Sequence, residues 1–468
     1  MELLAQFEKL IGPGHVLTGK DAAPYGRDWM GQYVSQPRAV LRPANAAEVS
    51  AVLKLANENG AGIVPAGGNT GLVGGSYAQD ALMLSLERLN KIREIKPNAQ
   101  IAVVEAGVVL ARIHEATEAH DLAFPLFFGA RGSAMIGGAL STNAGGSNVV
   151  RYGTTRALCL GLEVVLADGR IMNLMSELRK DNTGYDLKDL FIGAEGTLGV
   201  ITAAVLKLVP CPRAYATAMV AAKSLPAALT LLNRLQAATG GMVEAFEFMP
   251  RSYMAQLKRA LPDLVPPLGY DQDITILVEL GATAPRDANA NADGSIPVVE
   301  MLQDTLMEMI EADLAGDAVV AQSGDERLKM WAIREAAAEA TLSRTPYVNN
   351  DISVPLDLVA EFLETALSRL ADIDGAADTN TVAHLGDGNL HFTVFPGSDD
   401  TELHSRIRDM IDSLTIEMGG SFSAEHGIGL TKKATLAKGK DPVALAVMQS
   451  IKQALDPKGI MNPGKVLP

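Results

Sequence analysis

The sequence predicts an α+β protein that is divided into two or three domains. Its 468 residues are more than one ordinary hydrophobic core accommodates. Three glycine-rich segments, each next to a strand-like stretch, lie within the first 210 residues, whereas apolar strands and helical patterns alternate in the residues that follow. The first part therefore has the pattern of a domain that wraps a ligand, and the second part that of a separate domain.

Composition and charge exclude several classes of protein. The formal net charge of −15 argues against binding to a nucleic-acid backbone. Charged residues interrupt every long apolar run, so no membrane span is expected. The first ten residues have an amphipathic helical pattern without the basic region of a signal peptide, which predicts a cytoplasmic protein. The two cysteines, Cys159 and Cys211, are too few for a disulfide framework and lack metal-ligand spacing.

Hydrophobic periodicity places the regular elements along the chain. A spacing of three to four residues predicts helices, and short apolar runs bounded by turn residues predict strands. Helices are expected at 1–10, 49–59, 108–120 and 301–314, and strands at 62–65, 101–107, 162–169, 201–209 and 273–279.

The glycine-rich segments are the first candidate site. Residues 66–76 follow a strand and contain five glycines within nine residues, which lets several N–H groups point at one anion. The spacing is not that of a Rossmann fingerprint, and a flexible surface loop is the alternative. Residues 129–146 are too long for a hairpin turn and too apolar for a linker, so we expect a loop that lines something buried. Residues 189–199 form the third segment.

Two histidines near the end of the second part suggest a metal site. His384 and His391 flank a Gly-Asp-Gly turn between β-branched runs, so a hairpin would bring both imidazoles together. Imidazole binds Zn, Cu, Fe or Ni, and a carboxylate often completes the set. Glu425, followed by His426 in a second glycine-rich stretch, is the candidate. Taken singly, each histidine is more simply explained as a satisfied polar residue.

The glycine-rich segments resemble those of a known family. Pro65-Ala-Gly-Gly-Asn-Thr-Gly, Ser141-Thr-Asn-Ala-Gly-Gly and Gly193-Ala-Glu-Gly-Thr-Leu-Gly are similar to the FAD-binding domain of the vanillyl-alcohol-oxidase-type flavoproteins. With the histidines, Glu425-His426 and the terminal Met461-Asn-Pro-Gly-Lys, the chain resembles the branch that contains D-2-hydroxyglutarate dehydrogenase, D-lactate dehydrogenase and the glycolate oxidase flavin subunit.

That resemblance implies a vanillyl-alcohol-oxidase/PCMH-type FAD-binding domain at 1–210, an antiparallel α+β cap that binds substrate at 211–420, and a segment at 421–468 that returns to the FAD domain. It places the FAD contacts in the three glycine-rich segments and near the C-terminus. The implied contacts are Pro65, Gly67, Gly68, Asn69, Thr70, Gly71, Gly74, Gly75, Ser76, Gly132, Ser133, Gly137, Gly138, Ser141, Thr142, Asn143, Gly145, Gly146, Glu195, Gly196, Gly199, Val200, Ile201 and Asn462.

The resemblance also assigns the chemistry. A divalent metal, zinc or manganese, is expected on His384, His391 and Glu425, with His426 as the general base and Arg334 as the clamp for the substrate carboxylate. The reaction would oxidise a D-2-hydroxy acid to the 2-oxo acid, passing hydride to flavin N5 and then electrons to a protein or quinone acceptor. Without the resemblance, Arg334 is equally well explained as a helix-surface residue paired with a neighbouring acid.

Three positions that matter for the substrate's tail depart from the 2-hydroxyglutarate enzymes. The lysine and threonine that those enzymes use fall on Asn349 and Ala338, and an asparagine beyond the second metal histidine becomes Thr393. A substrate such as D-lactate therefore stays beside D-2-hydroxyglutarate as an expectation. Asn69 stands where relatives with covalent flavin carry a histidine, which predicts non-covalent FAD.

The sequence leaves two alternative functions and the oligomeric state open. The chain can instead be a glycolate-type oxidase subunit, or a flavin- and metal-binding protein without catalysis. A homodimer is compatible with the sequence.

Overall fold

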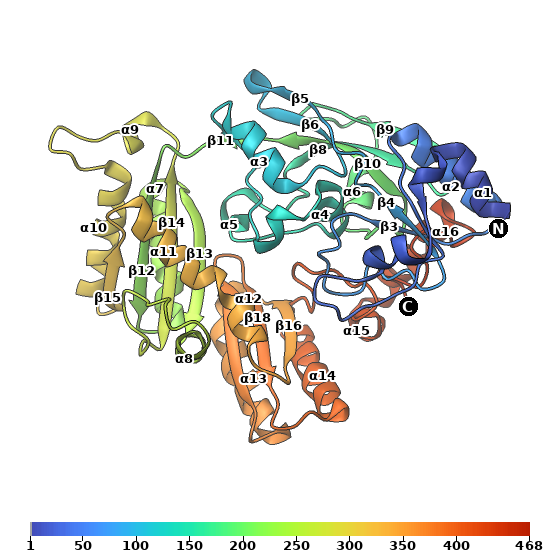
Figure 1. Ribbon diagram of the computed structural model, residues 1–468. Helices are drawn as coiled ribbons and strands as arrows, with labels where there is room; N and C mark the ends of the chain where they lie inside the picture. The colour runs from blue at the N-terminus through green and yellow to red at the C-terminus, as the bar shows by residue number, and fades with distance from the viewer. Residues whose placement is uncertain (1) are drawn as a thin grey trace. The chain divides into compact units, whose positions relative to one another are not determined.

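The computed structural model describes residues 2–468, and Figure 1 shows the order of their elements. These residues form two compact units. The first contains the chain up to Gly145, Gly153–Pro210 and Glu425–Pro468, and the second contains Gly146–Tyr152 and Cys211–Ala424. Each unit is described by itself.

The short helix α5 (Val149–Tyr152) departs from the predicted division, which had placed it in the first domain. The side chains of Asn148, Arg151 and Tyr152 hydrogen-bond to Glu244, at 2.8, 2.6 and 2.8 Å. These contacts with a buried carboxylate attach residues 146–152 to the second unit, which also ends at Ala424 rather than at residue 420.

The first unit contains two main sheets. Strands β2 (Ala39–Leu41), β4 (Leu82–Ser85) and β3 (Ile63–Ala66) run parallel, and β1 (Val16–Leu17) joins β2 antiparallel. The second sheet is antiparallel, in the order β5 (Ile92–Lys96), β6 (Ile101–Glu105), β10 (Val200–Lys207), β8 (Cys159–Val165) and β9 (Ile171–Leu174). A two-stranded pair joins β7 (Leu122–Ala123) and β11 (Val209–Pro210).

Helices complete the first unit. They are α1 (Glu2–Ile11), α2 (Ala46–Glu58), α3 (Leu110–Glu118), α4 (Ile136–Thr142), α6 (Lys188–Phe191), α15 (Lys433–Gly439) and α16 (Pro442–Leu455). Helix α2 begins where Asn45 accepts the N–H of Glu48 at 2.9 Å, an N-cap that the sequence can specify locally. The last residues of the chain also belong here, because Ile63 bonds to the carbonyl of Ile460 and receives the N–H of Asn462.

The second unit is built on one seven-stranded sheet in which every neighbouring pair is antiparallel, as the predicted fold class requires. Its order is β15 (Ala315–Val320), β12 (Ala214–Ala222), β14 (Ile274–Ala282), β13 (Val243–Pro250), β17 (Asp378–His384), β18 (Asn389–Phe395) and β16 (Val348–Ser353). Each strand turns alternate side chains to opposite faces, so the two faces have separate packing.

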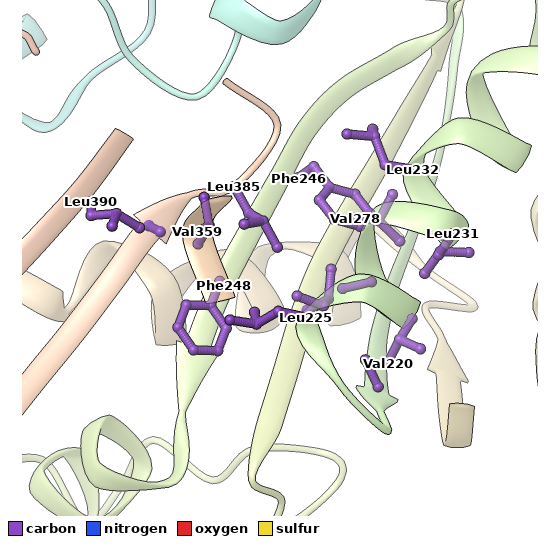
Figure 2. Packing of buried hydrophobic residues seen from close by; sticks show 14 of the residues in the cluster. Val220, Leu225, Leu231, Leu232, Phe246, Phe248, Val278, Val359, Leu385 and Leu390 are labelled. Atoms are coloured by element: carbon purple, nitrogen blue, oxygen red, sulfur yellow. The ribbon is translucent and has the colours of Figure 1, made fainter. Parts of the chain in front are cut away.

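Four helices cover one face of this sheet: α7 (Leu225–Thr239), α10 (Pro297–Glu311), α13 (Val359–Ile373) and α14 (Thr401–Glu417). Figure 2 shows part of this core, in which Phe246, Phe248 and Val278 of the sheet cluster with Leu225 and Leu231 of α7. Helices α8 (Arg251–Ala260), α11 (Gly324–Glu335) and α12 (Ala337–Leu342) pack on the other face, while α9 (Pro285–Ala288) lies in a connection. That second face carries the polar residues described below. Among the described residues, none of the helices has both the length and the apolarity needed to span a bilayer.

Candidate functional site: glycine-rich segments and a histidine-bearing sheet face

The three glycine-rich segments of the first unit lie against one another. A Cβ added at Gly68 would meet the carbonyl oxygen of Ser133 at 2.0 Å, so the first segment contacts the second through the backbone. The N–H of Glu195, in the third segment, donates to the carbonyl of Ser141 in the second at 2.8 Å. The fold therefore gathers three segments that are far apart in the sequence into one surface.

The second segment is not the continuous loop that the sequence predicts, because α4 forms its middle. Gly137 packs so closely on the turn that follows β6 that an added Cβ would meet the Cβ of Ala106 at 2.7 Å. The hydroxyls of Ser141 and Thr142 bond back to the carbonyls of Gly137 and Gly138. Glycine content suggested a loop, but small residues are also what a helix needs to approach a strand closely.

Several side chains that are predicted to contact the cofactor also make hydrogen bonds that shape the segments themselves. The amide of Asn69, at φ +57°, donates to a main-chain carbonyl at 2.8 Å and accepts the hydroxyl of Ser76 at 2.5 Å. The buried amide of Asn462 donates to the carbonyls of Gly75 and Glu195, at 3.0 and 2.7 Å. Asn462 thus ties the first segment to the third.

Glu195 joins these segments to the returning C-terminal chain. Its buried carboxylate accepts the N–H groups of Ile428 at 2.7 Å and Gly429 at 2.9 Å. Burial raises the pKa of this carboxyl, and the two N–H donors oppose the increase. The side chain therefore has structural partners within the first unit, and its role as a cofactor contact stays a prediction.

The segments leave room for a ligand close to their backbone. A Cβ added at Gly71, Gly132 or Gly138 would meet no atom within 4 Å among the described residues, so packing does not explain these glycines. Close approach of a ligand to the backbone does explain them. Positive φ angles at Asn69 and Gly74 bend the backbone of the first segment at two points.

The remaining predicted cofactor residues are distributed along the same segments. Pro65 lies in β3, Val200 and Ile201 begin β10, and Gly146 belongs to the second unit. The others, Gly67, Thr70, Asn143, Gly145, Gly196 and Gly199, lie within or directly beside the three segments.

The predicted hairpin is confirmed in the second unit. Strands β17 and β18 pair antiparallel, with His384 opposite Asn389 and Val382 opposite His391. His384 and Val382 share a face, so this register puts both histidines on one side of the sheet, with ring centroids 5.3 Å apart. Asp387 lies in the turn, where burial raises the pKa of its carboxyl to about 6 against the opposing effect of His384.

Glu247 is a site residue that the sequence reasoning missed. It lies on β13 opposite His384, and its carboxylate oxygens are 2.9 and 2.8 Å from His384 Nδ1. Arg334 of α11 approaches the same carboxylate, with Nε 2.8 Å from Oε2, at an angle too bent for a hydrogen bond. Burial raises the pKa of Glu247, but the charges of His384 and Arg334 outweigh it and the pKa is lowered. A glutamate inside the apolar stretch Val243–Pro250 was the available signal.

Asp351 extends the polar cluster on the other side of His391. The two residues are opposite each other in the β16–β18 pair, and their ligand atoms lie within 4.8 Å. Asn389 donates to Asp351 Oδ1 at 3.0 Å and to the carbonyl of Ile352 at 2.9 Å. Asp351 is almost fully buried, which places a second carboxylate beside the histidine pair.

The predicted substrate residues Asn349 and Thr393 lie on the same face. They pair across β16 and β18 two residues beyond Asp351 and His391, and Thr393 Oγ1 is 3.2 Å from Asn349 Oδ1. Two residues of strand span about 7 Å. The face therefore carries a neutral amide and hydroxyl at that distance from the histidine and the buried carboxylate.

Glu425 and His426 directly follow Ala424, the last residue of the second unit. The Ala424 N–H is 3.4 Å from the carbonyl of Asp351. Gly427 and Gly429 have φ values of +85° and +48°, so the chain bends here as expected. The metal-ligand role of Glu425 and the base role of His426 stay predictions.

Comparison with known families agrees with these two regions. Residues 37–175 match a family model described as an FAD binding domain, and residues 211–466 match the C-terminal domain of FAD linked oxidases. The chain belongs to the FAD-linked oxidases. This FAD-linked oxidase is accordingly an FAD-dependent oxidoreductase, as the resemblance implied.

Its relatives are similar along almost the whole length of this chain. The chain is 38% identical to mitochondrial D-2-hydroxyglutarate dehydrogenase of Bos taurus, covering 99% of this chain and 83% of that one. It is 34% identical to D-2-hydroxyglutarate dehydrogenase of Xanthomonas citri, and the match covers 95% of this chain and 92% of that one. Two solved structures share the predicted fold. That of p-cresol methylhydroxylase has a TM-score of 0.74 at 16% identity and covers 99% of this chain and 96% of its own. That of alkyldihydroxyacetonephosphate synthase has a TM-score of 0.71 at 15% identity and covers 99% of this chain and 84% of its own.

Proposed function

We propose that this FAD-linked oxidase oxidises a D-2-hydroxy acid to the 2-oxo acid with the help of a divalent metal, passing hydride to flavin N5. The observation that carries the proposal is the polar cluster on the sheet face that α8, α11 and α12 cover, in which two histidines, two buried carboxylates and Arg334 gather. The names of its relatives support the same reaction class.

The donor set fits a divalent cation. Glu247 engages His384 at Nδ1, which assigns Nε2 as the ligand atom, and His391 lies beside it. We assign Glu425 as the carboxylate ligand because the chain leads directly to it from Ala424. When bound, a cation there would act as a Lewis acid on the substrate hydroxyl. Zinc and manganese both suit two imidazoles and a carboxylate.

Two side chains then handle the substrate itself. His426 would remove the proton of the C2 hydroxyl as hydride leaves C2, because a neutral imidazole near working pH is the usual general base. Arg334 would bind the C1 carboxylate. Its side chain is 10% exposed, and its Nη2 has no hydrogen-bond partner among the described residues, while Glu247 occupies the Nε side. A buried guanidinium with such an atom is suited to an anionic ligand.

The substrate's second end meets Asn349 and Thr393. The relatives favour D-2-hydroxyglutarate as the substrate. The neutral pair favours a smaller acid such as D-lactate as a second candidate, because a distal carboxylate would meet an amide and a hydroxyl there rather than a cation.

Anaerobic mixing with substrate tests the proposal. D-2-hydroxy acids should bleach the absorbance of the bound flavin, and the L-enantiomers should not. Arg334→Lys should lower kcat/KM by about 10- to 100-fold through loss of bidentate binding, equivalent to roughly 1.4–2.8 kcal/mol. Arg369→Lys, which changes an exposed arginine paired with Glu417, is the matched control and should leave kcat/KM unchanged. Flavin that stays oxidised with the whole D-acid panel would refute the proposed reaction.

A further inference from the structure

Glu247 is distinguished from the other buried glutamates of the second unit by its partners. Glu244 accepts hydrogen bonds from Asn148, Arg151 and Tyr152, which anchor α5. Glu247, with a side chain 1% exposed, instead lies between His384 and Arg334. Its two partners are the groups that the proposed function assigns to the metal and to the substrate carboxylate.

Burying a carboxylate on an apolar strand is unfavourable unless charged groups compensate for the lost water. Both oxygens of Glu247 lie within 2.9 Å of His384 Nδ1, and Oε2 also lies 2.8 Å from Arg334 Nε. The strand register fixes this arrangement, since Glu247 and His384 are directly opposite each other on β13 and β17. Helix α11 brings Arg334 to the same point from outside the sheet.

Such a carboxylate determines how each partner is presented. An imidazole that donates its Nδ1–H to an anion has its proton and its ring orientation fixed, so Nε2 becomes the ligand atom and is made more basic. An anion at Nε likewise limits rotation of the guanidinium and leaves its terminal nitrogens to face a ligand. One side chain can therefore align a metal ligand and a substrate clamp together.

We propose that Glu247 is a positioning residue that fixes the orientations of the His384 and Arg334 side chains, so that cation binding and substrate-carboxylate binding depend on the same side chain. This inference rests on the proposed function. It predicts that one substitution weakens both, although Glu247 itself contacts neither ligand.

Glu247→Gln tests the inference in the full-length FAD-loaded protein. Gln keeps the volume but removes the charge and turns an N–H donor toward one of the two partners. Zn²⁺ affinity, measured by competition with a chromophoric chelator, should fall by about 10- to 100-fold. KM for the D-2-hydroxy acid should rise, and the flavin content should stay at one per chain.

Glu244→Gln is the matched control, because Glu244 is on the same strand and is also buried and charge-paired. It should lower the melting temperature without changing Zn²⁺ affinity by more than about threefold. If Glu247→Gln does not fold, Zn²⁺ affinity is measured in Glu247→Asp instead. Asp keeps the negative charge, but its shorter side chain moves the carboxylate away from one of the two partners.

Zn²⁺ affinity equal to wild type in whichever of these two variants folds would overturn the positioning role. A different result would count against the proposed function: wild-type protein that binds no Zn²⁺ or Mn²⁺ and is still fully active. The two failures are therefore distinguishable.

Discussion

Glu279 should anchor the helix that carries Arg334, and its replacement should be costly. This glutamate on β14 has a side chain 4% exposed. It binds Arg327 through two hydrogen bonds of 2.7 and 2.6 Å, accepts the Trp331 Nε1–H at 2.8 Å and accepts the Thr217 hydroxyl at 2.6 Å. Arg327, Trp331 and Arg334 follow one another on a single side of α11.

Glu279→Leu would leave the guanidinium of Arg327 and the indole N–H of Trp331 without their acceptor. Breaking a buried pair costs about 3–5 kcal/mol. Because Arg327 is 28% exposed and water can reach part of it, we expect the lower end, about 3 kcal/mol. Adding Arg327→Met removes the stranded charge, so the double variant should regain more than half of the loss.

Tryptophan fluorescence provides the assay. The chain has two tryptophans, and Trp29 is 55% exposed, so Trp29→Phe leaves Trp331 as the single reporter beside Glu279. Urea unfolding followed at this residue should show the predicted shifts, and KM for the D-2-hydroxy acid should rise as α11 loosens. The reasoning fails if Glu279→Leu costs less than about 1 kcal/mol, the range of an exposed ion pair, or if the double variant is no more stable than the single one.

Three other predictions follow from the sites. Acid precipitation should release the yellow flavin into the supernatant, because Asn69 cannot form a histidyl bond to it; colour that stays in the pellet would contradict this. Chelator treatment should abolish turnover while FAD stays bound. His384→Ala should lose the metal, whereas His426→Ala should keep the metal and lower kcat by about 10²–10⁴-fold. Loss of the metal in His426→Ala would instead make His426 a ligand. Burial, together with the charge of Lys433, lowers the pKa of Lys465 from 10.5 to about 8. Between these two pH values the folded state binds fewer protons than the unfolded state, so the free energy of unfolding should rise with pH. Lys465→Met should flatten that rise when urea unfolding is measured at pH 7.5–10.

Much of the site could be predicted from local sequence. The Gly-Asp-Gly turn and its β-branched flanks specify a hairpin, and the hairpin register alone puts His384 and His391 on one face. Gly427 and Gly429 likewise specify a bend, since positive φ angles are accessible to glycine without strain. These features depend on residues that are close together in the chain, so the sequence by itself determined them.

The tertiary structure decided which distant groups meet them. Glu247 is 137 residues from His384, and only the pairing of β13 with β17 makes it a partner of the histidine. The side chains of Asn69 and Asn462 bind carbonyls within their own unit because the fold brings those carbonyls into reach. Hydrogen bonds are short-ranged and directional. A sequence pattern can therefore name the residues able to make such bonds, while the packing of the elements selects the partners.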